Sequence, residues 1–395
     1  MKGSRAQSES ARTDAAYGGF EQGPIRPPSE ARSLLIRVTR NCPWNRCTFC
    51  PVYKGETFSI RPVAHVMRDI DAVHHQVQIL QSLGIDNSDV DRQMIMDAAR
   101  RQPAEDLPAF QAALHWITAG AMKSVFLQDA NSMAVKPDHL LQILKHLGTR
   151  FPSIERVTTY ARSASIARLT ADQLVAFRQA GLIRIHVGLE SGSDRVLRRV
   201  QKGVTKQIHI CAGRQVKEAG IELSEYYMPG LGGRDHWREH ALESADALSQ
   251  IDPDYIRLRS LVIPGKVPLA ADQDAGSFVM CTEVEVQEEI LLFLESLTNV
   301  TAKIRSDHIM NLLPEVDGKL PRDRQRLQQV IRDFLKLAPQ EQTLYRIGRR
   351  LGLFNGLKDL ADGDRRRLAE QNLRLLGIDS GNCDRILEEM VRRFV

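Results

Sequence analysis

The sequence has little cysteine, few aromatic residues and no long apolar run. Six of its 395 residues are cysteines and 6% are aromatic, whereas 43% are hydrophobic and 26% are charged. No apolar stretch approaches the length of a membrane span, so we expect no association with a membrane. The composition is that of a globular protein that buries a core without disulfides. Its length accommodates one large α/β domain with extensions, or two domains.

The sequence also lacks any block of consecutive lysines or arginines. A formal charge of +5 and a pI near 8.9 are modest for this length, so nucleic-acid binding is neither indicated nor excluded. The first residues contain no apolar segment typical of a secretory signal. We therefore expect a cytoplasmic protein, in a reducing compartment where clustered cysteines more often bind metal or do catalysis than form disulfides.

Strand-like and helix-like segments alternate along most of the chain. Residues 1–30 are polar and we expect them to be disordered, with the Pro-rich end "PIRPPSE" ordered against the body. The candidate strands that follow are residues 33–39, 123–130, 154–161, 182–190, 221–229 and 255–264. Several of the intervening helical patterns end on glycine, as helices commonly do. This alternation predicts parallel βαβ connections, hence a sheet covered by helices or closed into a barrel.

Two stretches depart from that alternation. Residues 85–121 are longer than a simple crossover and predict a helical insertion. Residues 266–395 read as a mainly helical, Arg-rich extension. This extension could hold RNA, but glutamates interleave with its arginines, which favours a cap over the barrel mouth.

Three of the six cysteines lie together in "NCPWNRCTFC", at Cys42, Cys47 and Cys50. The remaining three are scattered singly, as small buried residues often are. A structural zinc site closes with four ligands, and no second C-x-x-C or H-x-x-H is present, so zinc would need a distant fourth ligand. A cubane iron–sulfur cluster held by three cysteines would instead leave one iron open. The residues alone leave both alternatives standing.

The loop resembles the cluster loop of the radical S-adenosylmethionine superfamily. There a C-x3-C-x2-C pattern follows the first strand, with an aromatic residue before the last cysteine. Here Phe49 takes that place, and the first gap, Pro43 to Arg46, holds four residues. "VGLESGSDRVLRRVQKGVT" and "AGIELSEYYMPGLGG" are similar to the fourth-to-fifth strand region of coproporphyrinogen-oxidase-like and elongator-like members. The resemblance covers residues 33–265.

This resemblance implies a partial (β/α)6 TIM-like barrel over residues 31–265. It also implies a [4Fe-4S] cluster on Cys42, Cys47 and Cys50 whose open iron binds S-adenosylmethionine. One electron, from a donor such as flavodoxin or ferredoxin, would then cleave S-adenosylmethionine to methionine and a 5′-deoxyadenosyl radical that abstracts hydrogen from the substrate.

The resemblance also transfers individual roles. It places Phe49 beside the bound cofactors and Glu190 on the ribose hydroxyls. Arg162 is the candidate for the methionine carboxylate. The family's Gly-Gly-Glu turn is absent from residues 128–132, where Asp129 is the nearest stand-in for the contact with the methionine amino group. "MPGLGG" is similar to the glycine-rich backbone wall beside adenine.

Strand alternation predicts which side chains line the barrel interior. On the fifth strand it leaves the parity open between Glu222, Ser224 and Tyr226 and the alternative pair of Glu225 and Tyr227. The arginines expected inside are Arg37, Arg162, Arg184, Arg257 and Arg259. They either form an internal salt-bridge layer or leave positive charge for an acidic or phosphorylated substrate, since guanidinium suits bidentate binding of either group.

The sequence therefore predicts a radical S-adenosylmethionine enzyme acting on a small molecule or peptide. An RNA-modifying enzyme of the same superfamily is one alternative. A non-enzymatic zinc-binding or interaction protein is the other. The hydrogen abstracted is left open, as is whether S-adenosylmethionine is consumed or regenerated.

Overall fold

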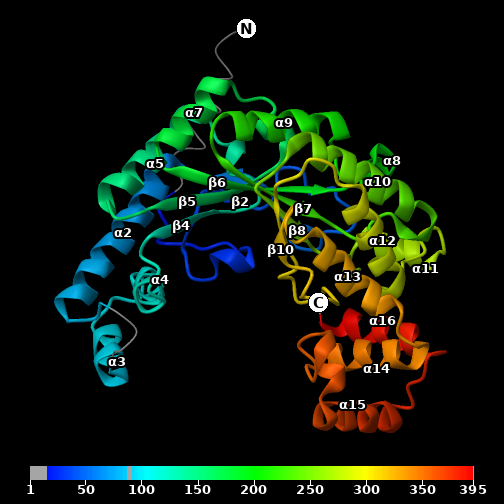
Figure 1. The fold of residues 1–395 in the computed structure, drawn as a ribbon. Helices are drawn as coiled ribbons and strands as arrows, with labels where there is room; N and C mark the ends of the chain where they lie inside the picture. Colours follow the sequence, from blue (N-terminus) through cyan, green and yellow to red (C-terminus); the bar gives the residue numbers. More distant parts are fainter. Residues whose placement is uncertain (1–15, 87–90, 395) are drawn as a thin grey trace.

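The computed structural model describes residues 16–86 and 91–394. Within this part of the chain, one sheet of eight strands runs in the order β1-β4-β5-β6-β7-β8-β9-β10 (Figure 1). Every neighbouring pair is parallel except β9 and β10. The strands are β1 (Leu34–Arg37), β4 (Ser124–Gln128), β5 (Arg156–Ala161), β6 (Leu182–Glu190), β7 (Glu222–Tyr227), β8 (Tyr255–Leu258), β9 (Lys303–Arg305) and β10 (Gly318–Lys319). A separate antiparallel pair joins β2 (Thr39–Arg40) to β3 (Ser59–Ile60).

Helices cover the outer face of the sheet as an arc (Figure 1). Those in the arc are α2 (Val63–Ser82), α5 (Pro137–Arg150), α7 (Ala171–Gln179), α9 (Lys206–Glu218), α10 (Gly233–Ile251) and α12 (Glu283–Ser296). The remaining α-helices are α3 (Arg92–Arg100), α4 (Leu107–Thr118), α6 (Ser163–Ile166), α8 (Asp194–Arg199), α11 (Pro268–Asp274), α13 (Arg324–Leu335), α14 (Pro339–Arg350), α15 (Gly363–Leu376) and α16 (Cys383–Phe394). Short 3-10 helices are η1 (Pro28–Glu30), η2 (Ser132–Ala134) and η3 (Leu357–Ala361).

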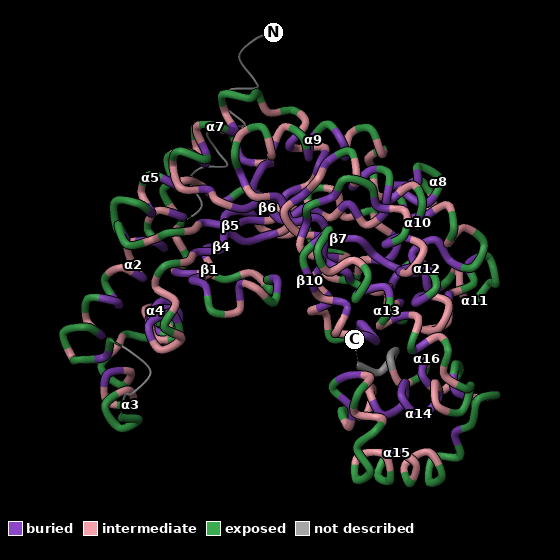
Figure 2. Tube along the Cα trace, in the orientation of Figure 1, coloured by how far each residue is buried: buried purple, intermediate pink, exposed green. Residues whose placement is uncertain are grey.

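The predicted α/β fold with an open, partial barrel is confirmed. All six expected strands form in the expected order, and each is followed by a connection that returns outside the sheet. β9 and β10 lengthen the sheet with residues from the C-terminal third. The core lies between the sheet and its helices, where buried residues follow the strands (Figure 2). Among the described residues, no helix is long and apolar enough to cross a membrane.

Residues 16–30 pack against the barrel, although we expected most of residues 1–30 to be disordered. The Tyr17 hydroxyl donates to Asp69 (2.8 Å), and Phe20 is buried. The Gln128 side-chain amide donates to the Ile25 carbonyl (2.7 Å). Residues 1–15 lie outside the described part of the chain. A few side chains therefore anchor a segment whose average composition is polar.

The interior of the barrel contains an aromatic layer from neighbouring strands. The rings of Phe126, Tyr160, His186 and Tyr226 contact one another at centroid distances between 5.1 and 6.4 Å. Glu30 is fully buried on one side of this layer, with a carboxylate oxygen 3.7 Å from His186 Nε2. The layer forms a floor between that carboxylate and the carboxyl ends of the strands.

The structure settles the parity of the fifth strand, β7. The Arg184 guanidinium donates to Glu222 (2.8 Å), and Arg257 donates to the hydroxyl of Ser224 (3.1 Å). With Tyr226 in the aromatic layer, the even-numbered residues of β7 face the interior. Tyr227 points the other way and stacks on Phe293 of α12, with ring centroids 4.2 Å apart.

Candidate active site

The three clustered cysteines lie on the loop between β2 and β3, at the carboxyl end of the sheet. All three are partly exposed. Backbone hydrogen bonds hold the loop on both sides, because the Thr48 N–H donates to the Val200 carbonyl (3.0 Å) and the Thr48 carbonyl accepts from the Leu269 N–H (3.0 Å). The Asn45 N–H donates to Cys42 Sγ (3.5 Å). Such N–H···S bonds tune the potential of iron–sulfur centres.

Two cations lie beside the thiols. Burial raises the pKa of the Cys47 thiol, and the charges of Lys202 and Arg162 oppose that rise. Burial also raises the pKa of the Cys50 thiol, against the Val52 N–H and Lys202. These positive charges favour thiolates, which are the form that binds metal.

Trp44, in the enlarged first gap, joins the cysteine loop to the connection between α8 and α9. Its indole N–H donates to the Gln201 carbonyl (2.6 Å), and the Arg162 guanidinium lies 4.9 Å from its ring centroid. Gly203 has φ +69° and approaches the ring so closely that a Cβ there would lie 2.2 Å from it. The four-residue gap thus carries a side chain that positions both the loop and Arg162.

Phe49 is buried in an apolar cluster that we call the Phe49 cluster. Cys47 and Cys50 pack against the same cluster. Its buried members are Phe49, Val196, Val200, Met228, Leu231, Ile263, Val267, Leu269, Ala270 and Phe278. The predicted aromatic residue is therefore an anchor of the loop, adjacent to two of the three thiols.

Asp129 is fully buried and its carboxylate is occupied by protein donors. Arg37 forms an ion pair with Oδ2 (2.7 Å), and the Tyr53 hydroxyl donates to Oδ1 (2.6 Å). Both oxygens lie under Gly23, where a Cβ would be 2.4 Å from Oδ1. Since Tyr53 follows the cysteines in the loop, Asp129 ties the end of β4 to that loop.

Glu190 has one free carboxylate oxygen at the end of β6. Its Oε1 accepts from Lys202 Nζ (3.2 Å), whereas Oε2 is buried and has no hydrogen-bond partner among the described residues. Burial lowers the pKa of Lys202, but Glu190 and Cys47 outweigh it and hold the pKa above its usual value. A Cβ at Gly188 would lie 2.3 Å from Glu190 Oε1, so glycine makes room for the pair.

Lys202 is a site residue that the sequence did not single out. It lies in the connection between α8 and α9, outside any strand, and its role depends on two distant segments meeting there. The quoted stretch "VQKGVT" contains it, but no spacing rule separates it from a solvated lysine.

The glycine-rich turn after β7 is held by a buried glutamate from α12. Glu289 accepts from the Tyr227 hydroxyl (2.6 Å) and from the Gly230 N–H (3.0 Å), and its Oε1 lies 2.8 Å from His240 Nδ1. His240 Nε2 lies 3.2 Å from the carbonyl oxygen of Glu190. This network fixes the turn relative to the end of β6.

The interior arginines divide into paired and unpaired groups. Arg37, Arg184 and Arg257 form ion pairs with Asp129, Glu222 and Asp307. Arg162 donates to the Lys202 carbonyl (2.7 Å) instead. Arg259 is exposed and has no ion pair among the described residues. Three of the five arginines therefore form the predicted salt-bridge layer, and two, Arg162 and Arg259, lie outside it.

The donor atoms are of the kind that bind an iron–sulfur cluster, because such clusters are held by Cys thiolates. Among the described residues, no three His, Cys, Asp or Glu side chains are grouped so as to hold a single metal ion. The three thiols, the flanking cations and the free oxygen of Glu190 all suit such a cluster with an organic ligand beside it.

A family model matches the part of the chain that carries the cysteine loop. The family model described as "Radical SAM superfamily" matches residues 36–245. No curated protein matches the chain. Similar solved structures include Elp3 of the archaeon Methanocaldococcus infernus, with 15% identity over 47% of this chain and 48% of that one and a TM-score of 0.38.

Two further solved structures show comparable similarity. Methylornithine synthase (PylB) has 13% identity over 75% of this chain and 68% of that one, with a TM-score of 0.41. Coproporphyrinogen III oxidase (HemN) from Escherichia coli has 14% identity over 73% of this chain and 55% of its own length, with a TM-score of 0.43. The chain thus spans about half the length of two of these three proteins. The family assignment rests on the match over residues 36–245, and the chain belongs to the radical SAM superfamily.

Proposed function

We propose that this radical SAM enzyme holds a [4Fe-4S] cluster on Cys42, Cys47 and Cys50, with S-adenosylmethionine bound beside it. When reduced, that pair of groups supplies a 5′-deoxyadenosyl radical able to abstract hydrogen from a substrate. The observation that carries the proposal is the free, buried Oε2 of Glu190 next to a loop of three thiols.

The residues around the loop would bind and orient these groups. Glu190 Oε2 can accept a hydrogen bond from a ribose hydroxyl, while Lys202 holds the other oxygen in place. Arg162, fixed by Trp44 and the Lys202 carbonyl, is suited to the methionine carboxylate. The burial of Asp129 under Gly23 favours a role in holding the loop over contact with the methionine amino group.

We infer an acidic or phosphorylated small molecule or peptide as substrate. Arg259 is exposed at the carboxyl end of β8, and its positive charge acts on Tyr160 and on His308. An anion above the aromatic floor would neutralise this cation. We also propose a flavodoxin or ferredoxin as electron donor and the cytoplasm as the location.

The first test is anaerobic reconstitution with iron and sulfide. We expect brown protein with about four irons that releases 5′-deoxyadenosine from S-adenosylmethionine and dithionite. Cys47→Ala should lose that release by at least about a hundredfold, because one iron loses its thiolate. Cys211→Ala, at an exposed cysteine outside the loop, is the matched control and should retain it.

The same preparation separates the alternatives. A colourless protein that binds zinc and releases no 5′-deoxyadenosine would contradict the proposal and support the zinc-binding alternative. An RNA-modifying enzyme would bind transfer RNA with an affinity that falls steeply as salt rises. A small-molecule or peptide enzyme would show no such binding.

A further inference from the structure

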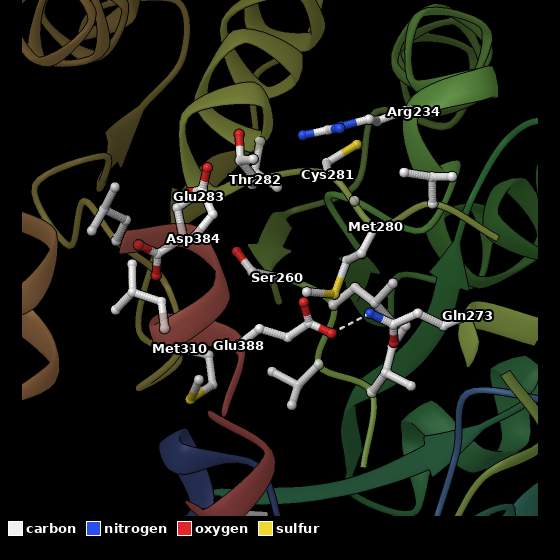
Figure 3. A pocket seen from close by; sticks show the side chains of 18 of the residues that line it. Arg234, Ser260, Gln273, Met280, Cys281, Thr282, Glu283, Met310, Asp384 and Glu388 are labelled. Carbon is white, nitrogen blue, oxygen red and sulfur yellow. Dashed lines mark hydrogen bonds between the residues drawn. The ribbon is translucent and has the colours of Figure 1, made fainter. Parts of the chain in front are cut away.

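A cavity of about 390 Å³ lies outside the cysteine loop, where the barrel meets the C-terminal helices (Figure 3). Its walls come from the turns after β7 and β8, the start of α12, the loop at Met310 and the helices α14 and α16. This volume is within the range of small-molecule sites, which run from roughly 300 to 1,000 Å³. The size is therefore that of a binding site.

Much of the lining is apolar. Leu261, Phe278, Met280 and Met310 contribute to it, together with Leu387 of α16. Phe278 also belongs to the Phe49 cluster, against which Leu261 and Met280 pack. The cavity wall is thus continuous with the apolar anchor of the cysteine loop. An occupant would bury mostly apolar surface.

Most charged side chains in the wall form ion pairs within the protein. Glu283 accepts from Arg346 (2.9 Å) and from Arg350 (2.8 Å), and Arg346 also pairs with Asp384. Arg234 pairs with a glutamate of α12 (2.9 Å). Because these charges have partners within the protein, the cavity favours an uncharged occupant.

Two buried acceptors in the lining lack donors. Gln287 is 2% exposed, and its Oε1 has no hydrogen-bond partner among the described residues. The Oε1 of Gln273 is likewise buried and unpaired, while its side-chain amide donates to Glu388 (Figure 3). A buried acceptor without a donor costs free energy, which a ligand N–H or O–H would recover.

We propose that this cavity binds a small, uncharged and mainly apolar molecule that donates a hydrogen bond to Gln287 Oε1. The site does not require the iron–sulfur cluster or S-adenosylmethionine. Its occupancy can therefore be measured by a binding experiment alone. If the proposed radical chemistry fails, the proposal for this cavity still stands or falls on its own test.

The test uses two probes of one shape, 5-fluoroindole with an N–H donor and 5-fluorobenzofuran without one. Fluorine NMR titrations of the full chain give both dissociation constants. We expect about fivefold tighter binding of the indole, the worth of one net hydrogen bond. In the Gln287→Leu variant the ratio of the two dissociation constants should be about one. Because this substitution replaces an unpaired acceptor by an apolar group, the variant should be as stable as the wild type.

Two variants control the interpretation. Gln76 of α2 is also buried with an unpaired Oε1 but does not line the cavity, so Gln76→Leu should keep the fivefold ratio. Met310→Trp should fill the cavity and weaken both probes at least tenfold. The proposal is overturned if neither probe binds at millimolar concentration, if the wild type binds both equally, or if Gln287→Leu keeps the preference.

Discussion

Two fully buried carboxylates, Asp129 and Glu289, hold the two sides of the candidate site in different ways. Asp129 holds the cysteine loop through an ion pair with Arg37, whose side chain is 15% exposed. Glu289 holds the glycine-rich turn through a tyrosine hydroxyl, a backbone N–H and His240, which is itself completely buried. The cationic partner of Asp129 is within reach of water, although its Tyr53 partner is buried, whereas the Tyr227 and His240 partners of Glu289 are completely buried.

The difference implies unequal consequences when the carboxylate is removed. On the cysteine-loop side, water can solvate Arg37 after its partner is lost, and the Tyr53 hydroxyl is left buried without its acceptor. On the glycine-turn side, the groups left behind stay buried and unpaired, which costs their full desolvation. The glycine-turn side should therefore be the more fragile in stability, and the cysteine-loop side the more sensitive in cofactor loading.

The largest effect is expected for Glu289→Ala. It removes the common acceptor of Tyr227 and Gly230 and the partner of His240, so we expect a loss of about 3–5 kcal/mol in the free energy of unfolding. Urea denaturation monitored by circular dichroism measures it. Glu289→Gln keeps one acceptor and should lose less. A smaller loss for Glu289→Ala than for Asp129→Ala would break the comparison.

Asp129→Asn tests the other side. The amide keeps the shape but loses the charge opposite Arg37, so we expect a loss of about 1.5–3 kcal/mol, the worth of a charged hydrogen bond. Iron content after reconstitution should also fall, because the amide holds Arg37 and the loop more weakly than the carboxylate, although its oxygen can still accept from Tyr53. If iron loading falls as far in Glu289→Gln as in Asp129→Asn, then holding the cysteine loop for cofactor binding is not a role specific to Asp129.

Two buried histidines, His186 on β6 and His209 on α9, should make stability depend on pH. Burial lowers the pKa of His186 to about 4 and that of His209 to about 3, below the ordinary value of 6.5. The unfolded chain therefore takes up protons first as the pH falls below 6.5. Stability should be constant above that pH and decline below it, by roughly 2 kcal/mol per histidine between pH 8 and 5.

His209→Asn checks the size of this decline. Its amide can replace the contact between His209 Nδ1 and the Ser163 hydroxyl (2.6 Å) without titrating. Denaturation at pH 8, 6.5 and 5 should show about half the wild-type decline. A wild-type stability that is flat from pH 8 to 5 would contradict neutral burial of both histidines.

The smallest effect is expected for Glu225→Gln. Glu225 is buried like Glu289, but the Leu189 backbone lies near its carboxyl group without a well-formed hydrogen bond to either oxygen. Burial, with the nearby Glu190 charge, raises its pKa well above the usual value. Because burial favours the neutral form of this carboxyl group, the amide should change stability by no more than about 0.5 kcal/mol. A larger loss would mean that Glu225 is ionised.

The sequence predicted the features that depend on local patterns. Alternation located all six strands, and the placement of Arg184 and His186 in the interior followed from their parity on β6. The position of the cysteines after the first strand, with Phe49 directly before the last of them, is equally local, whereas the burial of Phe49 emerged only from the structure. These predictions succeed because period and spacing are properties of a single segment.

Features that join distant segments escaped prediction. Lys202 matters because its connection meets both the cysteine loop and Glu190, and Glu289 reaches the glycine-rich turn from 59 residues away. The packing of residues 16–30 depends on Tyr17 and Phe20 within a polar stretch. The isolated aromatic residues in this segment could have indicated that it packs against the barrel, but its average composition is polar and hides them.

Trp44 would give the molecule an optical reporter of the proposed cluster. It is one of three tryptophans, and it lies in the loop that carries the cysteines, close to the guanidinium groups of Arg46 and Arg162. A coloured cluster beside the indole would quench its emission by energy transfer. Loading and loss of the cluster can therefore be followed in real time through intrinsic fluorescence, with Trp44→Phe as the blank.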